Sequence, residues 1–196
     1  MARNTNRTAM KRRAESGEEV RPDTIVVASG RYGSCVQYAK WLISGLGADA
    51  IEYSRQTLGY VSLYRNVIFV GAIRDAEVSN VNIMWQNYGN FGLEGRKIIV
   101  CGVGLGDPED EGYREKVMKR SSSLPEYCSF YILPGRIDRS RLKRLDGPQF
   151  DKFLVDAERM YGKDQADLIR ERAENDYNGI DYNALQPVID EILATR

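Results

Sequence analysis

Short, unbroken apolar runs rich in β-branched residues constrain the fold of this 196-residue chain more than any other feature. Four runs stand out, at 24–29, 66–71, 97–102 and 128–133, and a shorter one lies at 50–53. Apolar and polar residues do not alternate in these runs, so the predicted strands have no solvent-facing side. We therefore expect a sheet that is covered on both faces.

The residues between these runs favour helices. Apolar side chains repeat at helical spacing in 35–46, and further helices are predicted near 60–64, 81–88 and 111–120. Strands that alternate with helices over short loops indicate a parallel sheet with right-handed crossovers. Five strands suit an open, doubly wound sheet better than a barrel. The predicted fold class is α/β, with a five-stranded parallel sheet and helices on both of its faces.

The two ends of the chain differ from this central pattern. Residues 1–22 contain more Lys and Arg than Asp and Glu, and few large apolar side chains. This composition favours a disordered basic leader in front of a domain at 23–196. The alternative is that the leader contacts nucleic acid or anionic lipid. We favour the disordered leader and expect no nucleic-acid partner. The pattern at 136–182 is helical, and we interpret it as a helical insertion before a final helix at about 183–193.

The chain contains no histidine, and this excludes several kinds of chemistry. Ser-His and Cys-His nucleophile pairs, His metal ligands and imidazole acid-base catalysis are all ruled out. Cys35, Cys101 and Cys128 are odd in number, lie far apart and form no CxxC spacing. We therefore expect reduced thiols and no metal site. The reactive groups of an enzyme with this composition would come from a cofactor.

Two further expectations concern where the protein acts. No run approaches the ~20 apolar residues of a membrane-spanning helix, and the first twenty residues lack the apolar core of a signal peptide. We therefore expect a cytoplasmic protein. A basic stretch is either a solvated linker or a weak peripheral contact with an anionic membrane or an acidic partner; it comprises Arg136, Arg139, Arg141, Lys143 and Arg144.

Three loops follow predicted strands, at 29–35, 71–80 and 102–112, and open parallel sheets bind ligands at such carboxyl ends. The first loop, SGRYGS, combines hydroxyls, glycines and a helix N-terminus, a combination that suits a phosphate. A plain turn is the alternative.

Cys35 at the helix start is either a stabilised thiolate or a small residue that fits the turn. A Walker A motif is absent. The loop lacks the middle glycine of a dinucleotide fingerprint, although Glu52 keeps that alternative open.

Four segments carry a family resemblance: TIVVASGRYGS at 24–34, GAIR at 71–74, IIVCGVGL at 98–105 and YNGIDYNALQPVI at 177–189. Through them the chain resembles flavodoxin-fold proteins, in particular the flavodoxin-domain proteins related to the flavodoxin-like protoporphyrinogen oxidase. The resemblance covers 24–196 and implies a flavodoxin-like strand order of 2-1-3-4-5. It also implies FMN as the cofactor, with its phosphate in the first loop and its ring between the second and third loops.

The same resemblance implies a set of cofactor-binding residues. They are Ser29, Arg31, Tyr32, Gly33, Ser34 and Cys35 in the first loop, Gly71, Ala72, Ile73 and Arg74 in the second, and Gly102, Val103, Gly104, Leu105, Gly106 and Asp107 in the third. The glycine spacing of the third loop suits a backbone that approaches a planar ring. One departure is Asp75-Ala76-Glu77, which sets two carboxylates beside the expected ring, where they would oppose its reduction and Arg74 would favour it. Trp85 and Tyr113 either flank the ring or pack in the core.

We predict an FMN-binding, flavodoxin-like redox protein, most simply an oxidoreductase that passes electrons or hydride between a reductant and an organic acceptor. The acceptor would be of the quinone or porphyrinogen type, and the flavin would perform the chemistry, so no side chain is assigned as catalytic. Two alternatives remain. One is a flavin-free flavodoxin-like scaffold, which Asp75 and Glu77 support. The other is a nicotinamide-dependent reductase, which Glu52 alone supports.

Overall fold

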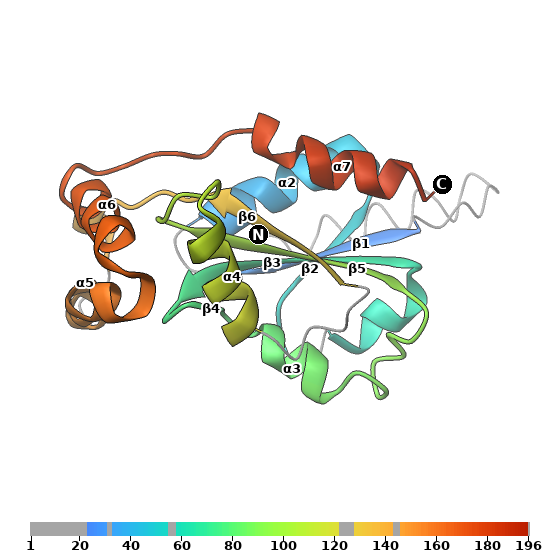
Figure 1. Ribbon diagram of the computed structural model, residues 1–196. Coiled ribbons are helices and arrows are strands. Elements are labelled where there is room, and N and C mark those ends of the chain that lie inside the picture. Colours follow the sequence, from blue (N-terminus) through green and yellow to red (C-terminus); the bar gives the residue numbers. More distant parts are fainter. Residues whose placement is uncertain (1–22, 31–32, 55–57, 122–127, 143–145, 196) are drawn as a thin grey trace.

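The computed structural model describes residues 23–30, 33–54, 58–121, 128–142 and 146–195. They form one sheet with helices on both faces and two further helices beyond one end of the strands (Figure 1). The strands are β1 (Thr24–Ser29), β2 (Asp49–Glu52), β3 (Asn66–Arg74), β4 (Glu77–Val78), β5 (Lys97–Gly104) and β6 (Cys128–Pro134). The α-helices are α2 (Ser34–Leu46), α3 (Val81–Gln86), α4 (Glu111–Arg120), α5 (Asp146–Tyr161), α6 (Lys163–Glu174) and α7 (Gln186–Leu193). Short 3-10 turns lie at Leu58–Leu63, Arg139–Arg141 and Asn183–Leu185. The predicted leader, 1–22, lies outside the described residues.

Five strands of the sheet are parallel, in the spatial order β2-β1-β3-β5-β6. Numbered among themselves along the chain, these strands have the order 2-1-3-4-5, which is the flavodoxin-like order. The prediction of an α/β fold with this strand order is confirmed. The predicted number of strands is wrong, because β4 pairs antiparallel with the end of β3 and makes a sixth.

The sixth strand belongs to a tight hairpin that the sequence pattern does not predict. Ile73 pairs with Val78, and Arg74 pairs with Glu77, so only Asp75 and Ala76 form the turn. Both turn residues have positive φ, 50° and 61°, which is the requirement of a type I′ hairpin. Such turns usually carry Asn-Gly or Asp-Gly. Because this turn contains no glycine, the usual sequence signal for it is absent.

Distant side chains hold the hairpin in place. The backbone N–H of Ala76 donates to the hydroxyl of Tyr161 on α5 at 2.9 Å. The N–H of Val78 donates to the hydroxyl of Ser121 at 2.9 Å. Because β3 runs on to Arg74 and β5 to Gly104, residues 71–74 of the loop predicted at 71–80 and residues 102–104 of the loop predicted at 102–112 are strand, which corrects both boundaries.

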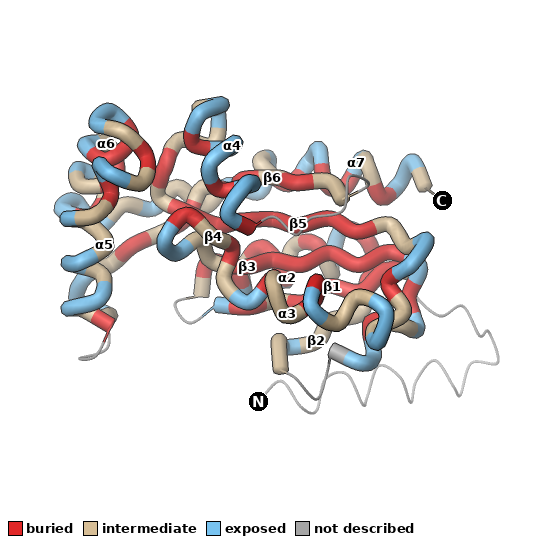
Figure 2. Tube along the Cα trace, turned by 60° about the horizontal axis from the view of Figure 1, so that its bottom comes forward, coloured by how far each residue is buried: buried red, intermediate tan, exposed pale blue. Residues whose placement is uncertain are grey.

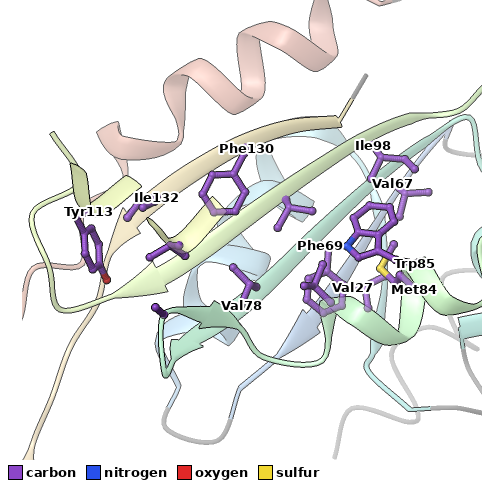
Figure 3. Packing of buried hydrophobic residues seen from close by; sticks show 14 of the residues in the cluster. Val27, Val67, Phe69, Val78, Met84, Trp85, Ile98, Tyr113, Phe130 and Ile132 are labelled. Atoms are coloured by element: carbon purple, nitrogen blue, oxygen red, sulfur yellow. The ribbon is translucent and has the colours of Figure 1, made fainter. Parts of the chain in front are cut away.

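Each face of the sheet carries its own apolar cluster. On one face, side chains such as Val26 and Ile68 pack against Leu42 of α2 and Ile192 of α7. On the other face, neighbouring side chains such as Phe69 pack against α3, α4 and the hairpin (Figure 3). Adjacent residues of one strand thus enter opposite clusters, and the inner strands are buried along their length (Figure 2). Because both faces of the sheet are buried, the strand sequences are unbroken apolar runs.

The carboxyl ends of the central strands are not level. Ser29, the last residue of β1, pairs with Gly71, which in turn pairs with Gly102. Strand β3 continues three residues past that level to Arg74, and β5 continues two residues past it to Gly104. The shorter β1 therefore leaves a step, with the extended β3 and β5 beside it. Helices α5 and α6 lie beyond these strand ends (Figure 1).

No helix within the described ranges combines the length and apolar character needed to cross a membrane.

Candidate functional site

A pocket of about 260 Å³ lies at this step, beyond the carboxyl ends of the strands. The order β2-β1-β3 reverses direction between β1 and β3, and doubly wound sheets bind their ligands at such switch points. Its walls come from five parts of the chain. They include Gly33, Ser34 and Cys35 at the start of α2, Ala72 to Asp75 of the hairpin, Val103 to Leu105 at the end of β5, Gly135 to Ile137 after β6, and Phe150, Phe153 and Tyr161 of α5.

Helix α2 presents its N-terminus to the pocket. Gly33 is the N-cap, in the left-handed region at φ 92°, and its carbonyl accepts the N–H of Gln37 at 2.9 Å. A glycine cap supplies no side-chain acceptor, and the first N–H groups of a helix have no acceptor inside the helix. Together with the helix dipole, these N–H groups favour an anion at this end.

Cys35 in the first turn of α2 serves packing. A Cβ atom at Gly30 would lie 2.9 Å from both Cβ and Sγ of Cys35, so only glycine lets the loop rest on the helix. Burial raises the pKa of the Cys35 thiol to about 12, although backbone hydrogen bonding and Arg74 act in the opposite direction. The thiol is therefore protonated at neutral pH, which favours the small-residue interpretation over the reactive thiolate.

The guanidinium of Arg136 lies near the start of α2. A Cβ atom at Gly33 would lie 3.4 Å from Nη2 of Arg136, which places the guanidinium beside the helix start. The backbone on both sides of Arg136 is fixed. Gly135 donates its N–H to the Gly104 carbonyl at 2.6 Å, and Ile137 donates its N–H to the Tyr177 carbonyl at 2.9 Å.

The rest of the basic stretch does not share this position. Arg139 pairs with Asp151 and lies over the ring of Phe150, with its guanidinium carbon 5.9 Å from the centroid. Nε of Arg141 lies 2.9 Å from Oδ2 of Asp138. Lys143 and Arg144 lie outside the described residues. Arg139 and Arg141 are thus in ion pairs, and Arg136 lines the pocket. The weak contact with an anionic surface or partner stays a prediction.

Helix α5 forms an aromatic wall. Phe150 and Phe153 have ring centroids 5.8 Å apart, and the Phe153 and Tyr161 rings are 6.3 Å apart. Tyr161 is also 5.0 Å from Tyr113, which is buried beneath the pocket. Helical periodicity predicts α5, but nothing local indicates that this face turns toward the strand ends. Tyr113 lies at one end of the apolar cluster and Trp85 at the other, so Trp85 does not flank the pocket (Figure 3).

The residues expected to bind the cofactor fall into three groups. Nine line the pocket: Gly33, Ser34, Cys35, Ala72, Ile73, Arg74, Val103, Gly104 and Leu105. Five do not: Ser29, Gly71, Gly102, Gly106 and Asp107. The hydroxyl of Ser29 accepts from the amide of Asn80 at 2.8 Å and lies in an adjacent hollow. The remaining two, Arg31 and Tyr32, lie outside the described residues.

Packing requires the glycines at and just beyond the end of β5. A Cβ at Gly102 would lie 3.0 Å from Val78 of the hairpin. A Cβ at Gly104 would lie 2.6 Å from the hydroxyl of Tyr113, and one at Gly106 would lie 2.4 Å from its ring. That their spacing also suits a planar ring stays a prediction.

Only one of the two carboxylates expected beside the ring lines the pocket. Asp75 is exposed at the hairpin turn and lines the pocket next to Arg74. Glu77 on β4 instead accepts a hydrogen bond from the side chain of Asn82, and it borders the adjacent hollow. Glu52, at the end of β2, is exposed and is not part of the pocket wall.

Among the described residues, no three His, Cys, Asp or Glu side chains lie close enough to hold a metal ion.

Comparisons with known proteins add only weak similarities. No protein-family model matches the chain, and no curated protein sequence matches it. Among solved structures, a provisionally assigned flavoprotein from Bacteroides eggerthii has a TM-score of 0.42 at 12% identity, covering 67% of this chain and 97% of its own. A flavodoxin, WrbA-like protein from Agrobacterium tumefaciens has a TM-score of 0.37 at 13% identity, covering 78% and 99%. An FMN-dependent NADH-azoreductase from Bacillus anthracis has a TM-score of 0.34 at 10% identity, covering 70% and 98%. Similarity this low carries no argument about the cofactor, so the fold assignment rests on the strand order.

Proposed function

We propose that the protein is an FMN-binding redox protein that transfers electrons or hydride between a reductant and an organic acceptor. The observation that supports this proposal most directly is the composition of the pocket at the β1/β3 switch point. It combines a helix N-terminus, a guanidinium beside that terminus and an aromatic wall. In flavodoxin-like sheets, FMN binds at this switch point.

The residues present fit the two ends of FMN. For the phosphate, the first-turn N–H groups of α2 and the guanidinium of Arg136 both offer donors. Gly33 keeps the space between them open, because a Cβ there would already contact the guanidinium. At the apolar end, Ile73, Leu105 and the α5 aromatics supply surfaces that suit a planar ring.

When bound, FMN supplies the hydride and electron chemistry, and the protein supplies binding, orientation and electrostatics. The α2 N-terminus would hold the cofactor by its phosphate. Tyr161 holds the hairpin through the Ala76 N–H, and so fixes Arg74 and Asp75 relative to the pocket. Phe150 and Phe153 exclude water from the apolar end, where a flat acceptor of the quinone or porphyrinogen type would also find aromatic contact.

Flavin uptake tests the proposal. The purified chain, stripped of bound flavin and titrated with FMN, is expected to quench FMN fluorescence with one site per chain. The complex should be yellow, and added FMN should raise the melting temperature, because a ligand that binds only the folded state stabilises it. A protein that neither quenches FMN nor is stabilised by it at saturating concentration would contradict the proposal and favour a flavin-free scaffold.

The charges on the hairpin are expected to set the potential of bound FMN. Arg74 favours the added negative charge of reduction, and Asp75 opposes it. Both side chains are exposed, so screening limits each effect to roughly 20–40 mV for a two-electron couple. Arg74→Gln should lower the midpoint potential and Asp75→Asn should raise it, as measured by dye-equilibrated titration.

Glu77→Gln is the matched control for these two variants, because Glu77 borders the adjacent hollow instead of the pocket. It should leave the potential within a few millivolts of the wild type. Equal shifts from Asp75→Asn and Glu77→Gln would show that neither charge acts at the cofactor specifically.

A further inference from the structure

The pocket wall near the α2 N-terminus carries a second group that can bind an anion, the guanidinium of Arg136. We infer that Arg136 is a phosphate-binding residue and makes the site select FMN over riboflavin, the same flavin without its phosphate. The inference rests on the proposed function and adds a residue that lies about a hundred positions after the phosphate loop in sequence.

The backbone of Arg136 is held in place by contacts on both sides. It forms an isolated antiparallel bridge with Asn178, and Gly179 donates its N–H to the carbonyl of Gly135 at 3.0 Å. Gly135 is itself tied to the end of β5 through Gly104. The backbone that carries Arg136 is thus already ordered, and ordering it costs no further free energy when an anion binds.

The guanidinium lies where a phosphate at the helix start would need a counter-charge. Its Nη2 would be in contact with a Cβ at Gly33, at 3.4 Å, and Arg136 lines the same pocket as Ser34 and Cys35. An arginine stays charged at any physiological pH and binds phosphate oxygens through two parallel N–H donors. Arg136 therefore adds charged donors to those of the helix N-terminus.

Of the other described arginines in this region, Arg139 and Arg141 do not line the pocket. Arg139 is engaged by Asp151 and Phe150, and Arg141 by Asp138. Arg74 lines the pocket from the hairpin and is exposed, so screening weakens its effect on an anion. The contact with the position of Gly33 places Arg136 beside the helix start, and we expect its guanidinium to contribute to the phosphate-specific part of the binding energy.

Parallel titrations with FMN and riboflavin test the inference. Arg136→Gln should weaken FMN binding about tenfold or more, the usual effect of losing a hydrogen bond to a charged group. It should leave riboflavin binding within about twofold of the wild type, because riboflavin has no group for the guanidinium to bind. Arg136→Lys should restore part of the FMN affinity, since it keeps the charge and loses the paired donors.

Arg139→Gln is the matched control, and it should change neither affinity because that side chain is already paired outside the pocket. Equal loss of FMN and riboflavin binding in Arg136→Gln, at an unchanged melting temperature, would overturn the inference and assign Arg136 a general role in pocket shape. Unchanged FMN binding would overturn it as well. A wild-type protein that binds both flavins equally well would overturn this inference but leave the proposed function standing. A wild-type protein that binds neither flavin would overturn the proposed function and this inference with it.

Discussion

Ser34→Glu is expected to abolish FMN binding while the protein stays folded. Ser34 is the first residue of α2 and lines the pocket, so a longer acidic side chain would place its carboxylate among the first-turn N–H groups. A carboxylate is favourable at a helix N-terminus, and Arg136 lies beside it, so the fold should not suffer. Two like charges about 4 Å apart repel by about 4 kcal/mol at an effective dielectric of 20, which corresponds to roughly a thousandfold in affinity.

Ser34→Gln separates charge from size in this experiment. Glutamine has nearly the same volume as glutamate and carries no charge, so it should cost FMN binding much less. Fluorescence titration gives the affinities, and thermal melting checks that both variants are folded. If glutamine abolishes binding as completely as glutamate does, the effect is steric and the anion is not bound at the start of α2.

Much of the fold could be predicted because it depends on local patterns. The runs at 24–29 and 128–133 and the helix at 111–120 correspond closely to β1, β6 and α4, since burial on two faces and helical periodicity are both visible in a short window. The hairpin could not be predicted, because Asp75 and Ala76 adopt positive φ with no glycine to signal it. Tertiary bonds from Tyr161 and Ser121 hold that turn, and no window of sequence contains them together with it.

Only part of the candidate site could be predicted from local sequence patterns. Its helix-terminal half could be predicted from the glycines and serines that follow β1, because strand, loop and helix start are contiguous in sequence. The other half consists of Arg136 and the aromatic side chains of α5, which reach the pocket only through the path of the chain after β6. Arg136 looked like one member of a basic stretch, since sequence spacing does not show that its neighbours Arg139 and Arg141 are paired elsewhere.

Gly135→Ala is expected to cause the largest loss of stability among conservative changes near the pocket. A Cβ at Gly135 would lie 2.8 Å from the carbonyl oxygen of Gly104, to which the Gly135 N–H donates. The clash is with backbone, so no side-chain rotation relieves it, and the segment after β6 has to move away from β5. Strain together with a weakened hydrogen bond should cost about 2–3 kcal/mol. In a domain of this size that lowers the melting temperature by roughly 5–10 °C.

Gly147→Ala is the matched control for this prediction. Gly147 lies in α5, and a Cβ there meets nothing within 4 Å. Alanine in a helix is more favourable than glycine by about 0.5–1 kcal/mol, so this variant should melt at or slightly above the wild-type temperature. Gly135 directly precedes Arg136 in the chain, so Gly135→Ala should lower FMN affinity as well as stability. Gly147→Ala should lower neither FMN affinity nor the melting temperature. If the two variants melt alike, the contact between Gly135 and Gly104 is not a close one, and the placement of Arg136 against α2 loses its support.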